Sequence, residues 1–280
     1  MLVLKKASAL KSYIYQNKPK YSIGFVPTMG ALHLGHISLI NQAKINCDIV
    51  VCSIFVNPTQ FNNKNDFDNY PQTIENDLKL LAKAGCDVVF VPDFNEIYNA
   101  ANSPHINLDK FGKIINVFEG ELRPGHFNGV IDVVTRLFLL VEPNQVFFGQ
   151  KDYQQCLVVK KLIEINNFDI KFNMCPSVRE EDGLAMSSRN IRLSSDERKM
   201  ATIPYKMLKF ISQNWPNKPE LLIKQAIDKF NSENVIKIEY LSICNANDLS
   251  FADINTTKPL ILFAGVLGST RLIDNMLVEN

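Results

Sequence analysis

The chain has 280 residues, of which 46% are hydrophobic, so it is long enough for about two domains with buried cores. Its 30 basic and 29 acidic side chains nearly cancel, and no basic block marks a nucleic-acid-binding surface. The apolar runs are far shorter than the ~20 residues of a membrane span, and six scattered cysteines lack metal or disulfide spacing, so we expect a cytoplasmic protein without nucleic-acid or membrane partners.

Strand-like and helix-like segments then alternate along the chain. Short apolar runs predict strands at residues 23–26, 49–56, 88–91, 146–148 and 170–174. Apolar residues at helical spacing predict a helix over 74–82 that ends at Gly85. A second helical pattern covers 131–141 and is stopped by Pro143. This alternation predicts an α/β fold, with a doubly wound, mostly parallel, Rossmann-like sheet.

The pattern changes beyond residue 192. Residues 194–197 read as a helix start, and two helical stretches follow before strand-like runs at 236–243 and 260–266. We therefore expect a Rossmann-like domain over 1–175 and a smaller α+β domain over 176–280.

Polar clusters follow four of the predicted strands. They occupy residues 27–36, 57–61, 149–155 and, after a short interval, 186–189. Because ligands of such sheets bind beyond the carboxyl ends of the strands, we expect these clusters to converge on one cleft.

The first cluster contains the motif His33-Leu34-Gly35-His36. Two imidazoles three residues apart at a helix start lie on one face, and Gly35 leaves room for a nucleotide against the backbone. The helix N-terminus adds N–H groups and a partial positive charge that suit a phosphate chain. A turn with two surface histidines is the alternative, but the preceding strand favours the phosphate site.

The last cluster is Met186-Ser187-Ser188-Arg189, preceded by Asp182-Gly183-Leu184. Two hydroxyls beside a guanidinium can form a mobile anion clamp, and Gly183 permits loop movement. Such a triplet also occurs in plain loops. Together with the upstream histidine motif, however, it is typical of nucleotidyltransferases that form adenylates.

Over nearly its whole length the chain resembles the pantothenate synthetase family. The matching stretches are FVPTMGALHLGH, SIFVNPTQF, YPQTIENDL, RPGHFNGV, FGQKDYQQ, VREEDGLAMSSRN and GSTRLIDN. The resemblance implies an ATP-dependent ligase that condenses pantoate with β-alanine through a pantoyl-adenylate intermediate, releasing AMP and pyrophosphate. It also implies a cytoplasmic homodimer, Mg²⁺, a first domain that binds nucleotide and pantoate, and a C-terminal lid.

The resemblance also assigns roles to individual residues. It implies an ATP site lined by Met29, Gly30, Ala31, Leu32, His33, Leu34, Gly35, His36, Gly149, Gln150, Lys151, Asp152, Val178, Met186, Ser187, Ser188 and Arg189. Within this set the catalytic residues would be His33, His36, Lys151, Ser187, Ser188 and Arg189. Pantoate would contact Gln60 and Gln155 with Asn57 beside them, and Asp77 would help to hold magnesium. Neutral glutamines suit this substrate because they bind its carboxylate without quenching it as a nucleophile.

Two positions depart from the family pattern. Gln150 stands where the family usually has glutamate, and Asn76 stands where an acidic residue is usual beside Asp77. The segment Arg123-Pro124-Gly125-His126-Phe127 also resembles a loop near the family's active site, or it is simply a tight turn. Neither Gln150 nor Asn76 changes the histidine motif, Lys151 or the Ser187-Ser188-Arg189 triplet, so we expect an active enzyme.

Other functions remain open at this point. Another adenylate- or cytidylate-forming transferase would keep both motifs but differ at Gln60 and Gln155. A tRNA synthetase is disfavoured by the balanced charge and short length. A nucleotide-binding regulator without catalysis has only Gln150 in its favour, against intact His36 and Lys151.

Overall fold

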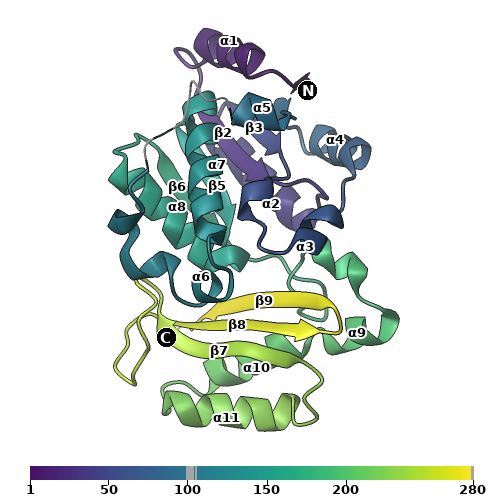
Figure 1. The fold of residues 1–280 in the computed structure, drawn as a ribbon, viewed down its shortest axis with the longest axis vertical. Helices are drawn as coiled ribbons and strands as arrows, with labels where there is room; N and C mark the ends of the chain where they lie inside the picture. The colour runs from purple at the N-terminus through teal and green to yellow at the C-terminus, as the bar shows by residue number, and fades with distance from the viewer. Residues whose placement is uncertain (99–103, 105, 279–280) are drawn as a thin grey trace. The chain divides into compact units, whose positions relative to one another are not determined.

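Six parallel strands form the larger of two sheets in the computed structural model, which describes residues 1–98, 104 and 106–278 (Figure 1). Their order across the sheet is β1-β4-β3-β2-β5-β6. The strands are β1 (Leu2–Leu4), β2 (Ile23–Thr28), β3 (Ile49–Ile54), β4 (Val88–Phe90), β5 (Gln145–Gly149) and β6 (Lys171–Cys175). The α/β fold with a parallel, Rossmann-like sheet is confirmed.

Helices cover both faces of this sheet, which explains why its central strands carry no polar alternation. All six residues of β3 are buried. Ile49 and Val51 pack into one hydrophobic cluster together with Leu10 and Ile131, whereas Val50 packs into another. The first cluster also takes in α1, α7 and α8, and the second takes in α2 and α4. A strand buried on both faces is a continuous apolar run.

The helices of this first part are α1 (Ala7–Asn17), α2 (Leu34–Asn46), α3 (Lys64–Asp68), α4 (Ile74–Lys83), α5 (Phe94–Ile97), α6 (Glu119–Leu122), α7 (His126–Val141) and α8 (Tyr153–Ile165). Helix α4 gives way to Gly85, whose positive φ of 75° suits a glycine after a helix end. Short 3₁₀ turns lie at Pro58–Gln60 (η1), Leu108–Ile115 (η3) and Gln150–Asp152 (η4).

Strand β2 lies at the point where the strand order reverses. From β2 the chain continues to β3 and β4 on one side, and later returns to place β5 and β6 on the other. Ligands of doubly wound sheets bind at such a switch point, beyond the carboxyl ends of the strands. The histidine motif follows β2 directly, so the topology favours the edge that the sequence predicted.

A second sheet has three antiparallel strands in the order β7-β8-β9. It consists of β7 (Lys237–Asn245), β8 (Pro259–Leu267) and β9 (Thr270–Leu277). It is accompanied by α9 (Ser195–Met200), α10 (Ile203–Gln213), α11 (Pro219–Phe230) and the 3₁₀ turn η5 (Ser188–Arg192). The helix start predicted at 194–197 is confirmed, because Ser194 and Glu197 cap each other's backbone N–H groups.

By its contacts the chain divides into two compact units. The first unit is Met1–Gly149 with Gln154–Pro176, and the second is Gln150–Tyr153 with Ser177–Asn280. The predicted division at 175 and 176 did not place the short segment after β5 with the C-terminal unit. Across the described residues, no helix is both long and apolar enough to cross a bilayer.

Candidate active site

The loop between β2 and α2 has a backbone that few residues can adopt. Gly30 has a φ of 80°, and Ala31 follows with a φ of 50°. A Cβ atom on Gly30 would lie 3.0 Å from Ile54 Cγ2 and 3.1 Å from Asp77 Oδ2. The turn therefore needs glycine at position 30, both for its φ and for the close approach.

Asp77 holds this loop from helix α4. Its Oδ2 accepts the Ala31 N–H at 2.9 Å, and its Oδ1 accepts the Leu32 N–H at 2.8 Å. The Thr73 hydroxyl also donates to Oδ1 at 3.0 Å, and Asp77 is only 1% exposed. Three protein donors thus use the carboxylate that the sequence assigned to magnesium.

The two motif histidines form a reciprocal cap at the start of α2. Gly35 N–H donates to His33 Nδ1 at 3.1 Å, and His33 N–H donates to His36 Nδ1 at 3.3 Å. The two ring centroids lie 4.1 Å apart. Because each Nδ1 accepts a backbone N–H, the proton of each neutral ring is on Nε2. The motif therefore favours the Nε2–H tautomer at both histidines.

The pantoate residues predicted after β3 form a hydrogen-bonded group around Asn57. Its Nδ2 donates to Gln60 Oε1 at 3.1 Å and to Gly129 O at 3.2 Å. Gln60 Nε2 in turn donates to Met29 Sδ at 3.0 Å. Asn57 is 1% exposed whereas Gln60 is half-buried, so Asn57 orients Gln60 rather than presenting its own side chain.

Tyr98 completes this group and was not predicted. Its hydroxyl donates to Asn57 Oδ1 at 2.8 Å, and Arg136 Cζ lies 4.7 Å from its ring centroid. Burial raises the pKa of Tyr98, which keeps the hydroxyl protonated as a donor. Both of these partners lie far away in the chain, so no local pattern could have revealed the contacts.

The family resemblance implies that this group binds pantoate. On that expectation, Tyr98→Phe should raise the KM for pantoate about 3- to 10-fold, because one hydrogen bond that orients Asn57 is lost. Steady-state kinetics at saturating ATP measure the change. Tyr15→Phe is the matched control, since Tyr15 is 84% exposed on α1. An unchanged KM in Tyr98→Phe would mean that the hydroxyl does not orient the group.

Helix α7 presses on the turn η1 that carries Gln60. A Cβ atom on Gly129 would lie 2.4 Å from Thr59 O and 2.7 Å from Gln60 N. His126 Nδ1 lies 2.8 Å from Gln60 O, and Gly125 adopts a φ of 80° just before α7. The Pro-Gly-His segment therefore makes a tight turn and contacts the backbone of Gln60, and its place beside an active site stays a prediction.

Gly149 ends β5, and Gln155 lies in the first turn of α8. Gln155 is half-buried. Its neighbour Gln154 is 4% exposed and donates to Ile114 O and Val117 O at 2.7 and 2.8 Å. The two glutamines thus differ, because Gln154 is buried and holds a loop, whereas Gln155 is half-buried.

The remaining predicted residues belong to the second unit. Met186 N–H donates to Val178 O at 3.0 Å, so a backbone hydrogen bond joins the two residues assigned to the adenine. Ser187 caps the turn η5 by accepting the Arg189 N–H at 3.3 Å. Lys151 and Asp152 lie in η4 together with Gln150. Among the residues that the structure describes, no three His, Cys, Asp or Glu side chains group as metal ligands do.

Comparisons with known proteins show which family the chain belongs to. A sequence model of the pantoate-beta-alanine ligase family matches residues 2–277. The chain belongs to the pantoate–β-alanine ligase family. It is 45% identical to the pantothenate synthetase of Acetivibrio thermocellus, with 100% of both chains covered, and 44% identical to that of Carboxydothermus hydrogenoformans, with 96% of both covered.

Solved structures of this family have the same fold. The pantothenate synthetase of Thermus thermophilus superposes with a TM-score of 0.92 at 36% identity, covering 100% of both chains. The pantoate-beta-alanine ligase of Francisella tularensis, solved with beta-gamma ATP and beta-alanine, gives a TM-score of 0.82 at 36% identity, covering 100% of this chain and 98% of that one. The predicted activity is confirmed: the chain is an ATP-dependent ligase that joins pantoate to β-alanine.

Proposed function

We propose that the histidine cap at the start of α2 binds the phosphates of ATP while pantoate is adenylated. In this step the pantoate carboxylate attacks the α-phosphorus, and the bond to pyrophosphate breaks. The amine of β-alanine then attacks the acyl carbon of the adenylate, the C–N bond forms, AMP leaves and the amine loses a proton. The observation that carries the proposal is the hydrogen bonding of both Nδ1 atoms.

Both imidazoles serve as donors without needing a positive charge. The backbone N–H aimed at each Nδ1 requires a lone pair there, which favours the neutral Nε2–H tautomer. The N-terminus of α2, a helix of 13 residues, adds its own partial positive charge. Donors fixed in advance stabilise charge that builds up on phosphate oxygens without reorganising during the reaction.

Gln60 and Gln155 are proposed to bind the hydroxyl groups and carboxylate of pantoate. The Gln60 amide is fixed by Asn57 at its oxygen and by Met29 at its nitrogen. An amide neutralises no charge, so the bound carboxylate keeps its reactivity toward phosphorus. Asn57 takes the role of a positioning residue in this proposal.

The other ATP contacts are proposed to come from residues 149–152, 178 and 186–189. Lys151 and Asp152, with Gly149 and Gln150 beside them, would bind the ribose and phosphates. Val178 and Met186 would flank the adenine, whereas Ser187, Ser188 and Arg189 would bind the departing pyrophosphate. A guanidinium next to two hydroxyls is a strong site for such an anion.

Magnesium is proposed to enter bound to the phosphates of ATP. Mg²⁺ commonly binds through substrate phosphates and water, with few protein ligands. The Asp77 carboxylate does not fit the role of a direct ligand well, because Ala31, Leu32 and Thr73 already donate to it. The homodimer, the cytoplasmic location and the lid role of the C-terminal domain stay predictions.

Exchange of labelled pyrophosphate into ATP tests the adenylation step. The full chain is assayed with ATP, Mg²⁺ and pantoate but without β-alanine. We expect exchange only when pantoate is present, and β-alanine in its place serves as the negative control. A folded chain that binds ATP but shows no exchange would contradict the proposal and favour the nucleotide-binding regulator.

A further inference from the structure

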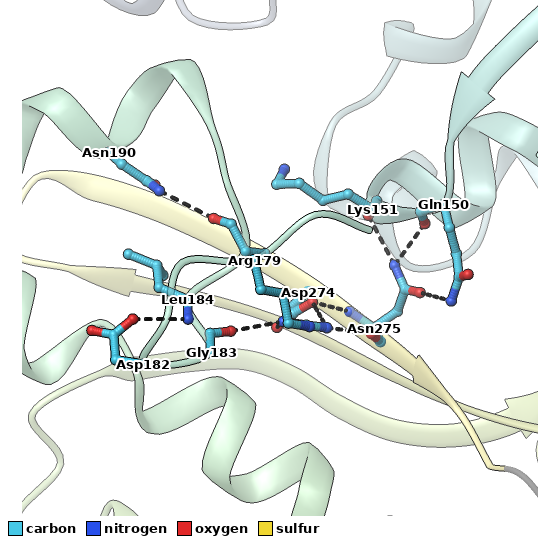
Figure 2. Close-up of polar contacts among 10 residues, drawn as sticks. Gln150, Lys151, Arg179, Asp182, Gly183, Leu184, Asn190, Asp274 and Asn275 are labelled. Carbon is cyan, nitrogen blue, oxygen red and sulfur yellow. Dashed lines mark hydrogen bonds and ion pairs between the residues drawn. The ribbon is translucent and has the colours of Figure 1, made fainter. Parts of the chain in front are cut away.

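Asn275, in β9, holds the backbone of segment Gln150–Tyr153 within the second unit. Asn275 Nδ2 donates to Gln150 O and to Lys151 O, each at 2.9 Å. Its Oδ1 accepts from Gln150 Nε2 at 3.3 Å (Figure 2). Asn275 is 2% exposed. One buried amide therefore holds the backbone of Gln150 and Lys151, and the Lys151 side chain extends away from it (Figure 2).

The preceding residue of β9 fixes a second segment. Asp274 pairs with Arg179 through two contacts, Oδ2 to Nη1 at 2.6 Å and Oδ1 to Nη2 at 2.9 Å. Arg179 Nη1 also donates to Gly183 O at 3.0 Å, as Figure 2 shows. Gly183 is the second residue of a loop that we define as residues 182–190 and call the serine–arginine loop.

Position 183 accepts only glycine in this arrangement. Its φ is 94°, and a Cβ atom there would lie 2.0 Å from Tyr205 Cδ1. Arg179 Cζ lies 4.7 Å from the centroid of the same Tyr205 ring. The start of the serine–arginine loop is therefore enclosed by Tyr205 and by the ion pair with Asp274.

We propose that Asp274 and Asn275 form a positioning pair, which holds Lys151 and the serine–arginine loop in the positions where both can bind ATP. The proposal rests on the proposed roles of Lys151 and Arg189 as ATP contacts. Neither member of the pair needs to touch the nucleotide. Two consecutive residues of one strand instead link two segments that are separated by about thirty positions in the chain, as their numbering shows.

The chemistry of position 275 supports this role. Two backbone carbonyls need two donors, and the neighbouring Gln150 amide needs an acceptor. A carboxamide supplies both within one short side chain, whereas aspartate would offer only acceptors. Gln150, the departure from the family's usual glutamate, contributes a donor that a glutamate could not.

Asn275→Ala in the full chain tests the proposal by kinetics. We expect the kcat/KM for ATP to fall about 10- to 100-fold, because small misplacement of a phosphate contact has effects of this size. The KM for pantoate should stay within about twofold of the wild-type value, since a residue that contacts the phosphates of ATP contributes little to the binding of pantoate. In a Lys151→Ala background the same substitution should add little, because the two residues act as one unit.

Asn231→Ala is the matched control. Asn231 is also 2% exposed in the second unit, and it exchanges hydrogen bonds of 2.8 and 3.0 Å with Ile236. It should lower the melting temperature without changing the kcat/KM for ATP. Equal kinetic losses in both variants, or none in Asn275→Ala, would overturn the positioning role and leave a structural one.

A milder variant and a binding measurement keep the test decisive. Asn275→Ser retains one donor, so it should fold and give an intermediate loss, and wild-type kinetics in it would count against the proposal. ATP binding by calorimetry separates the two proposals. If the wild type shows no pantoate-dependent exchange, the proposed adenylation fails. Weaker ATP binding in Asn275→Ala than in Asn231→Ala would still support the positioning pair.

Discussion

His36→Asn is expected to lower the rate of pantoate-dependent pyrophosphate exchange at least about 100-fold, the usual loss for one fixed donor to developing charge. Asparagine Oδ1 takes about the place of imidazole Nδ1, so it can still accept the His33 N–H. What it lacks is the Nε2–H donor. The variant therefore removes the phosphate contact and leaves the cap of α2 in place.

His36→Ala serves as the comparison, because it removes the donor together with the hydrogen bond that His36 contributes to the cap. Loss of the cap should lower the free energy of unfolding by about 1 kcal/mol, whereas His36→Asn should unfold close to the wild type. Exchange kinetics and thermal unfolding of both variants measure the two effects. Exchange within threefold of wild type in His36→Asn would mean that His36 stabilises α2 and does nothing for the phosphates.

Local patterns in the sequence were enough for most of the sheet. The apolar run at 49–56 predicted β3, and the structure gives Ile49–Ile54. Strands β1 and β9 were missed for different reasons. Leu2–Leu4 has three residues, too few for periodicity. In β9 the buried Asp274 and Asn275 interrupt the apolar pattern, because this strand uses polar side chains to hold two loops.

In the candidate site, too, local patterns revealed only the contacts between residues close together in the chain. The motif at residues 33–36 was found because its cap is local, with donors and acceptors within three positions of each other. Tyr98 and Asn275 were missed because each acts on residues far away in the chain. Gly129 was missed because its meaning depends on Thr59 packing against α7, and a glycine inside a helix has no such signature.

Asp77→Asn is the second substitution with a large expected effect. Asparagine offers one oxygen, so either the Ala31 N–H or the Leu32 N–H would face an amide NH₂ in a buried site. A buried donor left without an acceptor costs about 1–3 kcal/mol. Ala31, held at a φ of 50°, would relax and move His33, which lies two residues further along the chain. We expect kcat/KM for ATP to fall about 30- to 100-fold, because a shift of about 1 Å has that effect.

Magnesium titration distinguishes two roles of Asp77. One is to hold the loop between β2 and α2 through hydrogen bonds, and the other is the metal ligand that the family resemblance implied. A weakened metal ligand should recover activity as Mg²⁺ is raised, whereas a displaced loop should not. Asn76→Asp is the matched control: it restores the usual acid at an exposed neighbouring position and should change neither activity nor stability. Recovery of activity by Asp77→Asn at high Mg²⁺ would contradict the loop-holding role and establish Asp77 as a metal ligand. Loss at every Mg²⁺ concentration, with a lower melting temperature, would mean that this carboxylate acts through the N–H groups of Ala31 and Leu32 in the loop between β2 and α2.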